Sequence, residues 1–201
     1  MAKPHPELDK RLAALLDVRR NPLTEEEDEL RKACRDMLRI GSYKPTGRGK
    51  PSSEYLLRSA LEEDFPRINT VVDINNYVSL KYLVPISLWD TGKIEADSWL
   101  FRTGKPDESF VFNPSGQEIA LEDLVTGFAV LNGKETPILT PIKDCQQTKT
   151  DASTREVAAG IYYPAGWNGP PELQKVVDEF AELLEMVSGR VTGRIVDGDA
   201  G

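Results

Sequence analysis

Histidine is nearly missing from this chain of 201 residues, and the single one, His5, stands between two prolines near the N-terminus. Catalysis of the Ser-His-Asp or Cys-His type needs a histidine held beside its nucleophile, so the sequence argues against that class of hydrolase. A histidine-ligated zinc site is excluded for the same reason. Any reaction must therefore use hydroxyls, amides, carboxylates, backbone dipoles or groups of the substrate.

Cysteine is almost as scarce. Cys34 and Cys145 form no metal-ligand pattern, and no cluster of Asp and Glu stands at metal-ligand spacing. We therefore expect no metal. The two thiols are expected to be reduced, as is usual for a cytoplasmic protein.

Long apolar runs are also lacking. No window approaches about 18 uninterrupted apolar residues, so neither a transmembrane helix nor a membrane partner is expected. The N-terminal MAKPHPELDKRL has no apolar core of signal-peptide length, which argues against secretion. The expected location is the cytoplasm.

Two nucleotide-binding fingerprints are missing as well. Gly47-Arg-Gly49 is not continued into the G-x-G-x-x-G pattern, and Lys50 is followed by Pro51 where a phosphate-binding loop has Ser or Thr. We expect no dinucleotide, ATP or GTP, and no other cofactor.

What the sequence does contain is unevenly distributed charge. The net charge of -8 excludes a uniformly basic surface for nucleic acid. Residues 31–58, however, hold eight basic and two acidic residues, a local charge of 8 - 2 = +6. This segment can contact a phosphate backbone, or it can be a solvated helix face with i,i+4 ion pairs, and the pattern leaves both open. Its cations include Lys44, Arg48 and Lys50 in a Gly/Pro-rich loop, and Arg58 beyond it.

Apolar spacing and capping residues predict helices at both ends of the chain. Thr24 and Glu27 stand at capping-box spacing, and Ser52 and Asn69 are suited to cap later helices. The expected helices cover 6–20, a segment from 24 to about 40, 53–63, 70–82 and a segment from Pro171 onward. The expected strands cover 99–101, 110–112, 119–121, 125–131 and 157–163, with a hairpin turn at 113–116.

The predicted fold class is therefore α+β, a single domain with a mixed or antiparallel sheet between helices. Residues 1–40 are expected to form an N-terminal helical arm, 41–190 the main domain, and 191–201 a loose tail. The C-terminal helix is amphipathic, and its apolar stripe is expected to face the core. For 70–82 the Val and Ile content also suits a strand, so composition alone does not decide that element.

Residues 65–90 read FPRINTVVDINNYVSLKYLVPISLWD. This run resembles the editing and tRNA-binding module of the phenylalanyl-tRNA synthetase beta subunit, whose pattern is roughly I-N-x-V-V-D-V-T-N-Y-V, an apolar helix, and P-x-H-x-F-D. The resemblance covers roughly residues 67–163. It implies a helix at 70–82 and an editing/tRNA-binding domain at 41–190 that stands alone. The matching residues are Ile68, Asn69, Val71, Val72, Asp73, Asn76, Tyr77, Val78, Pro85 and Asp90.

The resemblance implies removal of a wrongly attached amino acid, typically tyrosine, from the 3′ end of a tRNA. An aminoacyl ester is already activated, so a positioned water and a donor to the developing oxyanion suffice. Asn76 matches an asparagine that lines the editing pocket, and its amide can orient substrate or water. Asn75 stands where the family usually has threonine. The other interpretation of Asn76 is a helix residue that bonds only to neighbouring backbone.

Two positions depart from the family pattern. Ser87 replaces the family histidine, and its hydroxyl can bond a water or a substrate hydroxyl but cannot act alone as a general base near neutral pH. The glutamate that reads the tyrosine hydroxyl falls near Gln146, so the edited amino acid is left open. The polar rim expected around the pocket, which also suits an ordinary polar loop, consists of Lys143, Asp144, Gln146, Gln147 and Thr148.

Three functions are compatible with these residues. The first is a trans-acting aminoacyl-tRNA deacylase whose partner is the aminoacylated acceptor end of tRNA. The second is a non-catalytic module that holds tRNA or a synthetase. The third is a hydrolase or binder of free amino-acid derivatives without nucleic acid. In the first, Asn76 and Ser87 line the pocket, and Lys44, Arg48, Lys50 and Arg58 hold tRNA phosphates.

Overall fold

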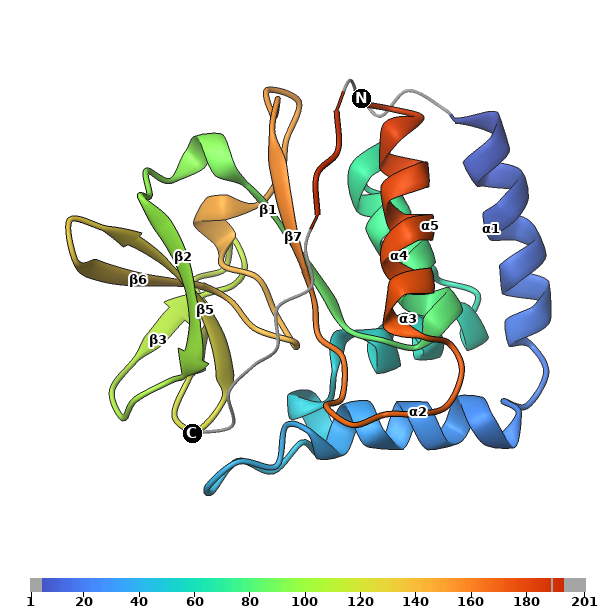
Figure 1. The fold of residues 1–201 in the computed structure, drawn as a ribbon, viewed down its shortest axis with the longest axis horizontal. Coiled ribbons are helices and arrows are strands. Elements are labelled where there is room, and N and C mark those ends of the chain that lie inside the picture. Colours follow the sequence, from blue (N-terminus) through green and yellow to red (C-terminus); the bar gives the residue numbers. More distant parts are fainter. Residues whose placement is uncertain (1–4, 189, 194–201) are drawn as a thin grey trace.

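The computed structural model describes residues 5–188 and 190–193 and has an α+β architecture. The helices gather on one side of the molecule, and the strands between residues 98 and 139 lie on the other (Figure 1). Between them runs an antiparallel ribbon of β1 (Ile86–Asp90) and β7 (Val157–Ile161), in which Ser87 lies opposite Gly160. None of the described helices is both long and apolar enough to cross a bilayer.

Two capped helices open the chain. In α1 (Pro6–Arg19), His5 Nδ1 accepts from the Leu8 backbone N–H. In α2 (Glu25–Asp36), the predicted capping box is confirmed, because Thr24 Oγ1 accepts from Glu27 N while Glu27 accepts from Thr24 N. Both helices bury leucines in the same core as α4.

Two further helices lead into β1. In α3 (Ser52–Leu61), the predicted cap Ser52 is wrong: Pro51 holds the N-cap position and Ser52 lies inside the helix. The Ser52 N–H donates instead to Pro141 O at 2.8 Å. Helix α4 (Thr70–Tyr82) has the predicted bounds and the predicted cap, since Asn69 accepts from Val72 N. Leu83, in a left-handed conformation, ends α4.

A mixed or an antiparallel sheet was predicted. Every pairing between named strands is antiparallel. One sheet joins β2 (Ser98–Thr103), β5 (Val125–Leu131) and β6 (Lys134–Leu139) in the order β2-β5-β6. A second pair, β3 (Ser109–Val111) and β4 (Glu118–Ala120), forms the predicted hairpin. Short 3₁₀ turns, η1 (Gly47–Gly49), η2 (Thr91–Lys93) and η3 (Gln146–Thr148), complete the described elements.

The central ribbon separates two hydrophobic cores. Ile86 and Leu88 point into the helical core, whereas Trp89 belongs to the core beneath the β2-β5-β6 sheet. This division follows from the two-residue period of a strand, which sends alternate side chains to opposite faces. All five residues of β1 are therefore buried.

The last helix, α5 (Leu173–Glu185), begins two residues after Pro171, so the predicted start is corrected: Glu172 occupies the N-cap position. Val176, Phe180 and Leu183 are buried, as expected for the core-facing side of the stripe. Of the tail predicted to be loose, 191–193 has no regular secondary structure and 194–201 lies outside the described residues.

Candidate functional site

The edge of β1 that faces away from β7 is the centre of the site. Toward β7, Tyr162 N donates to Pro85 O at 3.0 Å and Thr91 N to Glu156 O at 3.3 Å. Because backbone groups alternate in direction along an antiparallel ladder, those of Ile86 and Leu88 point to the opposite edge. Side chains from α4 and from the loop after β6 meet them there.

Asn75 reaches this edge from α4, and the adjacent Asn76 contacts Asn75. Asn75 Nδ2 lies 3.5 Å from Ile86 O and 3.4 Å from Asn76 Oδ1, so both hydrogen bonds are long. The residues are 7% and 9% exposed, which means that each amide is enclosed but not tightly bonded. Such amides keep donors and acceptors free for another group.

The loop after β6 brings Asp144 to the same edge. Its carboxylate interacts with the Ser87 hydroxyl and with the Leu88 backbone N–H. Ser87 Oγ also donates to Thr140 O at 2.9 Å and accepts from Tyr162 Oη at 3.3 Å. Since Ser87 is only 2% exposed, it acts as a buried junction between β1, β7 and this loop.

Burial dominates the ionisation of this cluster. It raises the pKa of Asp144 from its ordinary value of 3.8 to about 6, although the bonds from Ser87 and Leu88 and the charge of Lys149 oppose the rise. Burial also raises the pKa of Tyr162. A shielded carboxyl group that titrates this close to neutrality is more typical of functional sites than of structural ones.

Two oxygens of the cluster, Oδ1 of Asn75 and Oδ1 of Asp144, are enclosed and have no hydrogen-bond partner among the described residues. Oε1 of Gln146, in the same loop as Asp144, and Nε1 of Trp89 on β1 are enclosed and unpaired as well. Each unpaired buried polar atom costs about 1–3 kcal/mol, and such atoms are rare in folded proteins. Their concentration here favours a binding role over a purely structural one.

Positive charge gathers on the outer side of the same loop. Burial, together with the nearby charges of Lys149 and Arg48, lowers the pKa of Lys143. The Lys143 ammonium lies 4.7 Å from the ring centre of Phe112 and 5.5 Å from that of Tyr55. None of the three cations forms an ion pair within the described part of the chain. They therefore offer charge to an external anion.

The basic segment 31–58 contains both kinds of cation that its pattern left open: some are paired with acidic residues, and others have no ion-pair partner within the described part of the chain. Arg31 and Arg35 pair with Glu54, and Arg58 pairs with its i+4 neighbour Glu62 at 2.8 Å. Lys44 and Arg48 are exposed and Lys50 is half-buried, and no ion pair is found for them among the described residues. Arg48 is linked to the site through Lys143.

The loop holding Arg48 is fastened to its surroundings by two tyrosines. Tyr43 Oη donates to Gly49 O at 3.0 Å, and Tyr55 Oη donates to Gly47 O at 3.2 Å. Because Tyr55 also borders Lys143, the loop and the cation cluster share one support.

Thr148 and Gln147, which were predicted for the polar rim, have no contact with the edge of β1 among those described above. Thr148 is fully buried and its hydroxyl donates to Cys145 O at 3.4 Å, so it closes the η3 turn. Gln147 is exposed. The described residues contain no group of three or more His, Cys, Asp or Glu that could hold a metal.

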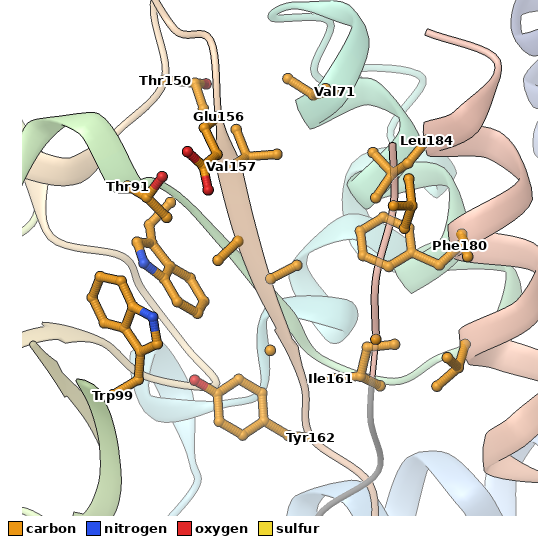
Figure 2. A pocket seen from close by; sticks show the side chains of 18 of the residues that line it. Val71, Thr91, Trp99, Thr150, Glu156, Val157, Ile161, Tyr162, Phe180 and Leu184 are labelled. Atoms are coloured by element: carbon orange, nitrogen blue, oxygen red, sulfur yellow. The ribbon is translucent and has the colours of Figure 1, made fainter. Parts of the chain in front are cut away.

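A broad apolar groove adjoins the cluster. Its walls come from β2, β7 and α5, and its volume is about 2680 Å³, well above the roughly 300–1,000 Å³ of small-molecule pockets. Figure 2 shows Trp99 and Tyr162 on one side of β7 and Phe180 and Leu184 on the other. Tyr162 connects the two features, because it lines the groove while its hydroxyl reaches Ser87.

The sequence interpretation missed Tyr162, Thr140 and Lys149. Tyr162 stands 75 positions from Ser87, and no local pattern predicts a contact at that distance. Thr140 contributes its backbone carbonyl, which has no sequence signal at all. Lys149 was identifiable only as a cation at the end of the polar loop.

Comparison with known proteins adds an independent line of evidence. The family model described as "B3/4 domain" matches residues 40–166. The chain is 31% identical over 110 residues to the phenylalanine–tRNA ligase beta subunit of Streptococcus pyogenes serotype M3 and to that of Streptococcus mutans serotype c, which covers 54% of this chain and 13% of each relative. A Staphylococcus epidermidis beta subunit is 31% identical over 107 residues, covering 53% of this chain and 13% of the relative. The chain thus matches only a small part of these relatives.

Proposed function

Because the chain belongs to the B3/4 domain family, we propose that it is a cytoplasmic, tRNA-binding trans-editing factor that hydrolyses the ester of mischarged aminoacyl-tRNA. The family and the similarity to phenylalanine–tRNA ligase beta subunits support a function related to tRNA or to a synthetase. Deacylation is the more specific part of the proposal, and it depends on the polar cluster at the edge of β1.

The observation that carries the proposal is the meeting of Asn75, Asn76, Ser87 and Asp144. Asn75 comes from a helix and Asp144 from a loop, and both contact β1, to which Ser87 belongs; Asn76 joins them through its bond with Asn75. The resemblance predicts the first three as pocket residues, and the fourth belongs to the predicted rim. Their enclosure and their unpaired oxygens support a pocket for a polar group rather than an ordinary helix end.

In the proposed reaction a water adds to the ester carbonyl, the ester C–O bond breaks, and the water's proton ends on the released ribose oxygen. Asn76 is the catalytic residue, and its amide N–H donates to the carbonyl oxygen as negative charge develops there. Ser87 is a positioning residue, because its hydroxyl already donates to Thr140 O and accepts from Tyr162. No general base beyond the substrate's own oxygen is required, which suits an activated ester.

The acceptor end of the tRNA is held by the cations beside the pocket. Arg48 and Lys149 lie close enough to Lys143 to lower its pKa, and these three cations would contact the phosphates next to the esterified nucleotide. Tyr55 and Phe112, which flank Lys143, offer faces on which unpaired bases stack. Lys44, Lys50 and Arg58 would extend this contact along the backbone.

A deacylation screen tests the proposal. tRNAs carrying cognate and noncognate amino acids are incubated with the wild type and with Asn76→Ala, and the remaining ester is measured. We expect one noncognate ester to be lost, with the rate reduced about 100-fold or more in the variant. Gln147→Ala, an exposed amide in the neighbouring loop, should keep the wild-type rate.

Survival of every ester at high protein excess would sink the deacylase. Salt-sensitive tRNA binding in the same sample would then favour a non-catalytic tRNA- or synthetase-binding module. The burial of Ser87, at the position where the family has histidine, is the observation that supports this second candidate.

A further inference from the structure

Three oxygen atoms of the site are enclosed and unpaired, and all three are acceptors. Asn75 Oδ1, Asp144 Oδ1 and Gln146 Oε1 have no hydrogen-bond partner among the described residues. The Asp144 carboxylate is acceptor-only when ionised, and an amide oxygen never donates. The ligand that satisfies these atoms must therefore be a donor.

The contacts of Asn75 and Asp144 place these two residues on the same edge of β1. Asn75 Nδ2 donates to Ile86 O, and the Asp144 carboxylate accepts from Leu88 N. These two backbone groups are neighbours on the same edge of β1, since O of residue i and N of residue i+2 point the same way in a strand. Gln146 follows Asp144 by two residues in the same loop, at the start of η3.

The number of acceptors selects among donor groups. A hydroxyl offers one hydrogen, whereas an ammonium offers three and carries a positive charge that suits a carboxylate. The nearest protein cation is engaged elsewhere, because Lys149 Nζ donates to Phe112 O at 2.6 Å. Every aminoacyl ester carries an α-ammonium group at a fixed distance from its reacting carbonyl.

We propose that Asn75, Asp144 and Gln146 form a subsite for the α-ammonium group of the aminoacyl moiety. This inference rests on the proposed function and deepens it: the subsite would recognise the backbone of the amino acid and not its side chain. It follows that the pocket takes aminoacyl groups with a free amine. N-acylated esters would leave three buried oxygens unpaired and would be rejected.

A binding experiment tests the subsite without depending on hydrolysis or on a particular tRNA. The probes are adenosine carrying alanine in amide linkage at the 3′ position, and the N-acetyl form of the same compound. Alanine has no donor in its side chain, so only the amine differs between them. We expect the free amine to bind to the full-length protein on the order of 100-fold more tightly.

Variants assign the effect to residues. Asp144→Asn, which preserves shape, should reduce the preference for the free amine by about 10- to 100-fold, and Gln146→Ala by about 10-fold. Gln147→Ala is the matched control and should leave it unchanged. Equal binding of the two probes, binding of neither, or a preference unaffected by both variants would overturn the subsite. The subsite and the deacylase can fail separately, since a protein that hydrolyses N-acetylated and free esters alike would keep the proposed function and lose the subsite.

Discussion

At the scale of single residues, the shielded Asp144 carboxylate lowers the stability of the folded protein. Its carboxylate is shielded from water, and one of its oxygens has no partner among the described residues. A protein selected for stability alone would place a neutral or apolar group there. A carboxylate that lowers stability at this position is explained if it binds a ligand.

This effect of Asp144 predicts how stability depends on pH. Because the folded-state pKa of Asp144 is raised from 3.8 to about 6, the folded state binds the proton more tightly than the unfolded state. The wild type therefore loses stability as pH rises through this window, and the full cost persists above it. Asp144→Asn should raise the free energy of unfolding at pH 7.5 by up to about 3 kcal/mol, and should change little at pH 3.5.

Urea unfolding at the two pH values measures this difference. Asp151→Asn serves as a control of opposite sign, because hydrogen bonds from Lys93 and Ser153 lower the pKa of that exposed carboxyl. Its replacement should not stabilise the protein at pH 7.5. An Asp144→Asn variant less stable than the wild type at pH 7.5 would contradict the assigned cause.

The side chains of the site were largely predictable, and their mutual contacts were not. Asn75, Asn76 and Ser87 follow from the resemblance, and Asp144 from the polar character of its loop. Tyr162 and Thr140 enter only through long-range packing around β1. Residue types carry chemistry, but only the paired strands bring them within bonding distance.

At the scale of elements, short sequence patterns correctly predicted two of the helix caps, which depend only on residues close together in the chain. The capping box of α2 and the Asn69 cap of α4 are short-range devices, and both are present. The pattern assigns no strand to β1 or β6. In β1 all five residues are buried, so the alternation that identifies a strand is absent. In β6 the polar residues and Pro137 hide the strand.

Asn69 couples one of these caps to the site. Its Oδ1 accepts from Val72 N at 3.1 Å, while its Nδ2 donates to Thr150 Oγ1 at 2.9 Å, tying the start of α4 to the loop after η3. Asn69→Ala loses both bonds and should reduce the free energy of unfolding by about 1–2 kcal/mol. Asn69→Asp keeps the cap and loses only the bond to Thr150, so about half of that loss is expected. Chemical denaturation of the two variants separates the contributions, and equal losses would show that the cap contributes nothing.

At the scale of the whole molecule, the N-terminal helices and α4 share a core and a buried cation. Arg19 is 3% exposed and donates to Leu80 O at 3.2 Å and Lys81 O at 2.6 Å, while pairing with Glu27. It thereby binds the last carbonyls of α4, where a positive charge is favourable. The boundary at residue 40 stays a prediction, but these contacts favour an arm that folds with the rest of the chain.

Replacement of Arg19 by methionine tests that coupling. It leaves the carbonyls of Leu80 and Lys81 without their donor and removes the ionic partner of the partly exposed Glu27, so we expect a loss of about 2–4 kcal/mol in one cooperative transition. Arg20→Met, at an exposed position whose partners Asp17 and Glu63 are also exposed, should cost less than about 1 kcal/mol. A separate early transition in the Arg19 variant would instead mean that the arm unfolds independently.

The distribution of charge over the molecule gives the last prediction. A net charge of -8 repels nucleic acid, so the proposed tRNA binding requires a local contact with the cations beside the site. Each phosphate contact that is removed lowers the slope of log affinity against log salt by about one. Arg48→Ala and Lys143→Ala should each do so. Arg11→Ala removes the same charge from α1, where Arg11 pairs with Glu7 and Glu182, and should leave the slope unchanged. Binding titrations across a range of salt concentrations decide the matter: an equal effect of all three variants would mean that the tRNA responds to net charge and not to a site.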